Sequence, residues 1–356
     1  MDCGLFACTA ASSSLTPPPP PFRSGFPKFP RGGLRRRRLI VAASGRASSS
    51  RCEFSGLNAP LEPTTPSGRL LSTVLQNDRD YFPAAAAEQL QQLACDRDQA
   101  VARMSLSLAS DEACLHRRIS ELREMECQAG VEDVMYMLII HKFSEIRVRL
   151  VPRLSKCVYN GRLEIWPSRD WQLESIHSSE ALDLVKHHLA SVIGLRPNAK
   201  LPDIWAPTRA RLFHLSRVYA VSISYGYFLK SASLRHYLEQ SLSHSTGQKR
   251  QLCCPSGQAS GGVQTSLMQG METTLQSYVM RFEPETLRLF GKPKSKVALK
   301  VAERHTGALF GVDLDEEDEI SISLASLKRI VLEAIAFGSF LWDTEEYTNN
   351  IYNLHS

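Results

Sequence analysis

Acidic and histidine side chains that could bind a metal ion are present, but their spacing does not match a metal site. A di-iron helical bundle needs two Glu-x-x-His motifs, and only Glu174 with His177 fits that pattern. The acidic segment 313–319 differs from a calcium-binding EF-hand loop, because its sixth and twelfth positions hold Asp318 and Leu324 instead of Gly and Glu. We therefore predict no metal or other cofactor and interpret this segment as a solvated acidic loop.

Motifs of nucleotide binding and hydrolysis are absent from the sequence. It contains no GxGxxG, GxxxxGK(S/T), GxSxG or HExxH pattern, which mark dinucleotide sites, phosphate loops, serine hydrolases and zinc proteases. His141 near Glu145, the pair His187 and His188, and His305 have no second cluster to join. We interpret them as structural histidines, so we predict no catalytic residue. The absence of these motifs favours a protein that is not an enzyme.

Nine cysteines form no CxxC pair. Thiols of this kind are usually inert in a reducing compartment. Cys253 and Cys254 are adjacent within a segment rich in Ser and Gly, and they are the one candidate redox pair, although neighbouring cysteines form only a strained disulfide.

Two of the four tryptophans, Trp166 and Trp171, lie within six positions of each other, beside Pro167. They are candidates for an exposed aromatic interaction surface. The competing interpretation is that they cover the most apolar helix, because large aromatic side chains are usually mostly buried. We favour this second interpretation.

That most apolar helix lies within residues 131–171. Seven consecutive apolar residues from Val134 to Ile140 leave no face that can point at water. Glu132 and Asp133 before them predict a helix start, and the helix of about four turns should stop before Pro152. The Asn-Gly pair within Val158–Leu163 then predicts a β-hairpin.

Apolar residues at helical spacing account for most of the remaining chain. Four predicted helices have both a start and an end: Ser110–Glu112 to Gly130, Ser178 or Ser179 to Gly194, Thr208 to about Glu239, and Ser295 to Gly311. Four more are predicted by their start alone, at Pro83, Leu275, Pro284 and near Leu327. Residues 320–324 alternate and fit either a short strand or the start of the last helix. The expected fold is a mainly α multi-helix bundle with at most a short β-hairpin near Val158–Leu163.

Small residues in two of these helices predict close helix packing. Ala334 and Gly338 share the inward face of the last helix, and the segment YAVSISYGYFLKSASL in the helix after Thr208 is rich in Ala, Ser and Gly. Such residues let two helix backbones approach each other.

The positive charge of the chain belongs to its first residues. The chain has 42 Lys and Arg and 37 Asp and Glu; residues 1–42 hold seven of the bases and one of the acids, which leaves 35 bases and 36 acids. Without an excess of positive charge, the remainder has no general attraction for phosphate backbones, and we predict no nucleic-acid partner.

The first residues have the composition of an organelle transit peptide, rich in Ser, Pro and Arg, with no acid between Asp2 and Glu53. Processing is expected between Ala42 and Ala43, although the leader could extend to residue 52. A nuclear-localisation cluster and a mitochondrial presequence are the alternatives.

The domain organisation follows from these segments. We expect a transit peptide over 1–42, disorder over 43–69, a helical domain over 70–242, a flexible linker over 243–268, and a C-terminal helical unit over 269–356 that packs on the first. Leu75-Gln76 is echoed by Leu275-Gln276, so the two units could be copies of one another or similar by chance. The most apolar stretch, Ile330–Trp342, is too short to span a bilayer, which takes about 20 residues.

Several segments resemble a plant family of UV-B-induced chloroplast proteins that is defined by a domain of unknown function. They are GVEDVMYMLIIHKFSEIRVRLVPRLS with YNGRLEIWP, and LQSYVMRFEPETLRLF with ALFG and LEAIAFGSFLWD. The resemblance implies a plastid location and a helical fold, and it supplies no catalytic residues. We predict a stromal interaction or regulatory protein associated with light or UV-B stress, with an unknown plastid protein as its partner. The alternative is a carrier or enzyme that holds a tetrapyrrole or lipid between its helices.

Overall fold

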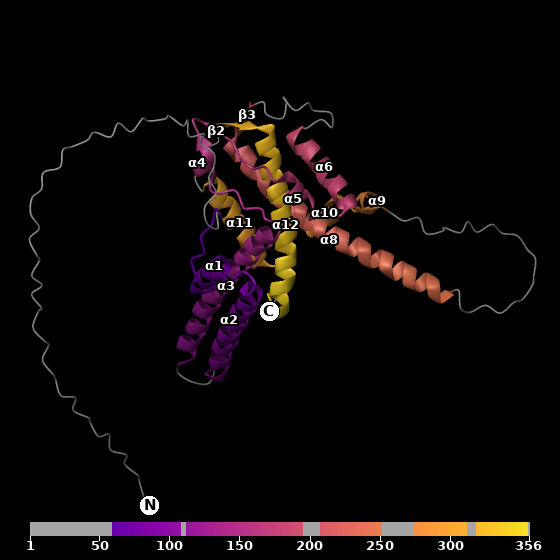
Figure 1. Cartoon of the computed structure of the whole chain (residues 1–356). Coiled ribbons are helices and arrows are strands. Elements are labelled where there is room, and N and C mark those ends of the chain that lie inside the picture. The colour runs from indigo at the N-terminus through magenta and orange to yellow at the C-terminus, as the bar shows by residue number, and fades with distance from the viewer. Residues whose placement is uncertain (1–58, 108–111, 195–206, 251–273, 312–317, 355–356) are drawn as a thin grey trace, which may run out of the picture. The chain divides into compact units, whose positions relative to one another are not determined.

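A computed structural model describes residues 59–107, 112–194, 207–250, 274–311 and 318–354 of the chain (Figure 1). Helices dominate these residues, which confirms the mainly α fold. The helices are α1 (Pro66–Asn77), α2 (Phe82–Leu106), α3 (Ala113–Glu145), α4 (Leu154–Cys157), α5 (Asp170–Glu174), α6 (Ser179–Ile193), α8 (Leu212–Arg250), α9 (Leu275–Val279), α10 (Pro284–Phe290), α11 (Lys296–Phe310) and α12 (Leu324–Tyr352). The strands are β1 (Val158–Tyr159), β2 (Arg162–Leu163), β3 (Pro207–Arg211) and β4 (Glu319–Ser323).

The backbones of helices α8 and α12 lie very close together where the two helices cross, and this crossing is at the centre of the core. A Cβ atom added to Gly226 of α8 would collide with the backbone oxygen of Ile335, and one added to Gly338 of α12 would collide with that of Ile223. The Ser339 hydroxyl also donates a hydrogen bond to the Gly226 carbonyl at 3.2 Å. The predicted close packing of small residues is therefore confirmed.

Helix α3 runs unbroken from Ala113 to Glu145, which corrects two expectations. Glu132 and Asp133 do not start a helix but lie buried in the middle of one. Gly130 does not end a helix either, because it lies inside α3 where an added Cβ would meet the side chain of Leu93 on α2. Packing on both sides of the glycine keeps the helix continuous in spite of its low propensity.

The predicted hairpin is present and belongs to a larger sheet than expected. Strands β1 and β2 pair antiparallel around Asn160 and Gly161, whose φ angles of 51° and 71° suit a tight hairpin turn. Strand β4 pairs parallel with β2 and antiparallel with β3, so the strand order is β1-β2-β4-β3. Of the two interpretations of residues 320–324, the strand is correct, and α12 begins directly after it with Ser323 as its N-cap.

Most helix ends lie where the sequence places them. Pro83 lies in the first turn of α2, Ser178 caps the start of α6, and Gly194 ends that helix with a φ of 69°. The helix expected from Thr208 starts later than predicted, because residues Pro207–Arg211 form β3 and α8 begins at Leu212. Helix α8 then continues past the predicted end near Glu239 to Arg250, eight residues into the predicted linker.

Residues assigned to two units share one core in the structure. Helix α12 packs against α8, α3, α2 and α6, and α11 packs against α3 and α8. The segments that echo each other in sequence form helices of different length, since α1 has 12 residues and α9 has five. Helix α1 begins at Pro66, so the last residues of the segment predicted to be disordered are helical.

Several sequence predictions lie wholly or mostly outside the described residues. They concern the leader over 1–42, the processing site at Ala42 and Ala43, the pair Cys253 and Cys254, and most of the predicted disordered segment 43–69, linker 243–268 and acidic loop 313–319. Across the part of the chain that the structure describes, no helix combines the length and the apolar character that a membrane span requires.

Candidate functional site

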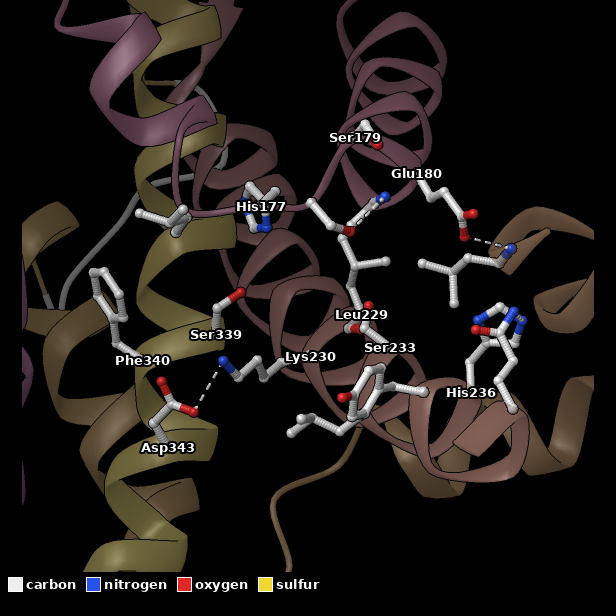
Figure 2. Close-up of a pocket in the computed structure, with 17 residues that line it drawn as sticks. His177, Ser179, Glu180, Leu229, Lys230, Ser233, His236, Ser339, Phe340 and Asp343 are labelled. Carbon is white, nitrogen blue, oxygen red and sulfur yellow. Dashed lines mark hydrogen bonds and ion pairs between the residues drawn. The ribbon is translucent and has the colours of Figure 1, made fainter. Parts of the chain in front are cut away.

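A polar cleft of about 430 Å³ lies between the start of α6, the middle of α8, and α12 (Figure 2). We call it the polar cleft. Apolar side chains, among them Leu229 and Phe340, form part of its wall. Its polar lining includes His177, Glu180, Lys230, Ser233, His236 and Asp343. None of these residues was predicted as a site from sequence, because they come from helices that are far apart in the chain.

Lysine and aspartate side chains set the charge of the polar cleft. Lys230 Nζ lies 3.2 Å from Asp343 Oδ1, and Lys142 Nζ lies 3.5 Å from Asp343 Oδ2 (Figure 2 draws the first pair). Asp343 therefore lies between two ammonium groups, and because Glu180 also lines the cleft, two acids and two bases balance there. Glu180 has a structural role: its Oε2 accepts a hydrogen bond from the Leu275 amide at 2.9 Å, which links α9 to α6.

Two serine hydroxyls of the polar cleft bond to the backbone, and one of its imidazole rings is neutral. Burial, together with the charge of Lys230, lowers the pKa of His177 to about 4, so the ring is neutral at neutral pH. The Ser233 hydroxyl donates to the Leu229 carbonyl at 2.7 Å, and the Ser339 hydroxyl donates to backbone carbonyls. These two hydroxyls are therefore occupied by the backbone, and the remaining polar lining can bind a small polar molecule.

A second hollow runs along α8 and is predominantly apolar. It consists of two adjoining cavities of about 490 and 380 Å³ that share Ser224, Pro293 and Leu299. We call it the apolar groove. Its other lining residues include Val221, Tyr225, Phe228, Val279, Leu287 and Ala302. The shape and lining suit a hydrocarbon chain better than a polar metabolite.

A chain of hydrogen bonds crosses the core from α3 to α12. The Tyr136 hydroxyl lies 3.3 Å from His305 Nδ1, and the Tyr219 hydroxyl lies 2.8 Å from His305 Nε2 and 3.5 Å from Glu333 Oε1. Because Tyr219 donates its hydrogen to Glu333, it accepts from His305 Nε2–H, which leaves Nδ1 to accept from Tyr136. Burial lowers the pKa of His305 to about 3 and raises the pKa of both tyrosines.

The same chain of hydrogen bonds ends in a buried ion pair. Arg329 Nη1 lies 2.8 Å from Glu333 Oε2, and Arg329 Nη2 donates to the Arg149 carbonyl at 2.9 Å. Burial raises the pKa of Glu333, and Arg329 and the Val151 amide partly oppose that effect. The sequence did not predict this buried network of hydrogen bonds and an ion pair, because Glu333 and Arg329 resemble ordinary positions of an amphipathic helix. Neither the polar cleft nor the apolar groove is lined by these side chains, so they hold the core together.

The sequence-predicted candidates take up separate positions. Trp166 is 49% exposed and Trp171 is 71% exposed. The favoured interpretation, that both cover the apolar helix, is therefore wrong for Trp171 and applies to only about half of the Trp166 surface. A peptide bond in the cis form joins Trp166 to Pro167, and Trp171 lies in α5.

Two of the candidate histidines, His141 and His188, pack against aromatic rings, and His187 is exposed. His141 stacks on Phe82 at 4.7 Å, and His188 stacks on Tyr225 at 4.2 Å while its Nε2 lies 3.0 Å from the Ser222 hydroxyl. Within the described ranges, no three His, Cys, Asp or Glu side chains gather closely enough to hold a metal ion.

These features define a mainly helical protein with two clefts beside a core built on crossed helices. The profile of the family described as Protein of unknown function (DUF760) matches residues 114–242. A UV-B-induced chloroplastic protein of Arabidopsis thaliana is 34% identical in an alignment that covers 89% of this chain and 83% of that protein. The chain belongs to this family of UV-B-induced proteins with a domain of unknown function. No solved structure matches it.

Proposed function

We propose that this protein is a non-enzymatic interaction protein of the chloroplast stroma, associated with the response to light or UV-B. The exposed tryptophans Trp166 and Trp171 carry the proposal. The leader composition and the name of the Arabidopsis relative support the chloroplast location. The Ser233 and Ser339 hydroxyls of the polar cleft are bonded to backbone carbonyls, which supports binding over catalysis.

The segment 156–171 has the composition of a protein-binding surface. Trp and Tyr dominate the energetics of protein interfaces because they bury a large area at low entropic cost. Tyr159 is exposed like the two tryptophans, and the basic side chains of Lys156, Arg162 and Arg169 are exposed among them. Trp166 and Trp171 are five residues apart, which limits the distance between their Cα atoms to roughly 18 Å, so one partner can contact both.

The partner that fits this segment is a stromal protein with an apolar pocket bordered by acidic side chains. Glu164 is the exposed acid between the two exposed arginines, and it pairs with Arg162 at 2.6 Å. An acidic border on the partner would complement Lys156 and Arg169. Electrostatic complementarity of this kind mainly sets specificity and the rate of association.

The experiment is affinity capture from chloroplast stroma with a photo-crosslinking residue in place of Trp171. We expect one acidic protein to crosslink at this position, and to be lost when Trp171→Ala or Trp166→Ala is used as bait. Tyr81→Ala, which removes an exposed aromatic residue beside the start of α2, serves as the matched control and should retain the partner. Equal recovery with all variants would refute the role of the tryptophans, and loss after nuclease treatment would indicate a nucleic-acid partner instead.

The apolar groove favours a second candidate function, which is binding of a lipid. A hydrocarbon chain that fills the groove would remove apolar surface from water along α8 and gain roughly 25 cal/mol per Å² of area buried. Titration with a fluorescent fatty acid tests this function. Val221→Arg places a charge on the exposed edge of the groove and should weaken binding roughly tenfold or more, whereas Val101→Arg on α2 should not. Equal affinities for the two variants would exclude the groove as the site.

A further inference from the structure

The outer half of α3 has an apolar face that nothing in the described residues covers. Over 113–126 only Ser120 is buried, while almost every residue from Gly130 to Phe143 is. Leu115 is 58% exposed, Ile119 39% and Leu122 42%. Contiguous exposed apolar side chains on a helix are characteristic of interaction surfaces.

These three residues form one stripe on α3. Their spacing of four and three residues places them on the same side of a helix with 3.6 residues per turn. The buried positions Ser120 and Cys127 point in a direction about 120° away from the stripe by the same geometry. Helix α2 packs against α3, and the two run side by side in Figure 1. The stripe therefore lies on a face of α3 that the α2 contact does not bury.

We infer that a second copy of this chain covers the stripe, with the two α3 helices antiparallel and related by a two-fold axis at Leu122. Arg118 and Glu126 lie four residues before and four residues after Leu122. An antiparallel pairing centred there places Arg118 opposite Glu126 of the partner subunit, on both sides of the axis. It also places Ile119 opposite Met125 of the partner subunit, so apolar side chains meet between the two ion pairs.

Charge disfavours two other arrangements of the same stripe. A parallel pairing would place Arg118 beside its own copy. An axis between Ser120 and Glu121 would place Arg118 opposite Arg123, which also brings like charges together. Like charges at an interface are costly and exclude wrong registers. Arg118 and Glu126 currently pair with Glu121 at 3.4 Å and Arg123 at 2.8 Å, both exposed ion pairs of little strength that can rearrange.

The first test is the concentration dependence of the mass of the full chain, measured by analytical ultracentrifugation. One helix face is a small interface, so a dissociation constant on the order of micromolar is expected. Leu122→Asp should weaken the dimer roughly tenfold or more. Leu106→Asp, at an exposed leucine near the end of α2, is the matched control and should dimerise like the parent chain.

A charge exchange tests the register. Arg118→Glu alone and Glu126→Arg alone should each weaken the dimer, because like charges then face each other, and the double variant should restore it. A dimer that is indifferent to all three changes, or a parent chain that is monomeric at every concentration, would overturn the inference.

Crosslinking tests the position of the axis. A cysteine on a two-fold axis lies next to its own copy, close enough for a disulfide. Leu122→Cys should therefore form a disulfide-linked dimer under mild oxidation. Leu106→Cys should crosslink no more than the parent chain, which carries the exposed thiols of Cys95 and Cys114. Equal crosslinking of the two cysteine variants would rule out the proposed axis.

Discussion

Arg329 and Glu333 form an ion pair at 2.8 Å inside the core, one turn apart on α12, with both side chains buried. The pair lies at the end of the hydrogen-bond chain that starts at Tyr136. A buried ion pair adds little stability compared with apolar side chains, but the loss of one partner is costly, because the other charge stays in a medium of low polarity. This relationship gives the first prediction.

Glu333→Gln should lower the free energy of unfolding by about 3–5 kcal/mol, because Arg329 remains charged and buried. Arg329→Met should cost less, since Glu333 can take up a proton and Arg329 cannot lose one. The double variant should recover part of the loss, measured by urea denaturation. Equal and additive losses would mean that the two side chains do not interact.

The helix crossing gives the second prediction. Gly338→Ala and Gly226→Ala should each destabilise the protein by about 3 kcal/mol or more, because the added methyl group collides with backbone of the facing helix and α8 must move away from α12. Gly307→Ala is the control within α11, where an added Cβ meets nothing within 4 Å. This variant should be neutral or stabilise the protein by up to about 1 kcal/mol. A similar stability for all three variants in urea denaturation would contradict the close crossing.

His305 gives a prediction about pH. Its pKa is lowered to about 3 in the folded chain from an ordinary value of 6.5, so the unfolded chain binds one more proton between these values. Stability should therefore fall as the pH falls below about 6.5, with His305 contributing about 1.4 kcal/mol per pH unit. His305→Gln should remove this contribution, so the slope of unfolding free energy against pH should fall by about 1.4 kcal/mol per pH unit, which corresponds to one proton. His187→Gln, at an exposed histidine, is the control, and the same slope for both variants would refute the role of His305.

Asp133 gives a prediction about local stability. Its Oδ2 accepts hydrogen bonds from the amides of Thr64 and Thr65 at 2.8 Å, and Arg304 Nη2 donates to its Oδ1 at 3.2 Å. The carboxylate thus holds the start of α1 against α3. Asp133→Ala should increase amide hydrogen exchange across α1 by about an order of magnitude or more, because these amides lose a charged acceptor.

Amide hydrogen exchange in α8 and α12 shows whether the effect of Asp133→Ala is local. If the substitution releases α1 alone, the amides of α8 and α12 should exchange as slowly as in the parent chain. Asp183→Ala removes an exposed carboxylate that pairs with Lys186 on α6, and it should leave exchange in α1 unchanged. Uniformly faster exchange over all helices would instead indicate a general loss of stability.

The candidate site shows where sequence reasoning reaches its limit. Trp166 and Trp171 could be proposed from the sequence, because neighbouring tryptophans are visible as a pattern. The polar cleft could not, since Lys230 and Asp343 are 113 positions apart and meet only where α8 crosses α12. Their types and spacing carry no signal until the crossing is known.

The sequence by itself determined the mainly α fold, the caps at Ser178 and Gly194, and the hairpin at Asn160, because local side-chain chemistry and apolar spacing decide such features. Only the tertiary structure decided that Glu132 and Asp133 lie in mid-helix, that β3 and β4 extend the hairpin into a sheet, and that Glu333 meets Val151 and Tyr219. Each of these depends on a neighbour that is distant in the chain. Buried ion pairs and strand pairing offset local preference through contacts that no short stretch of sequence contains.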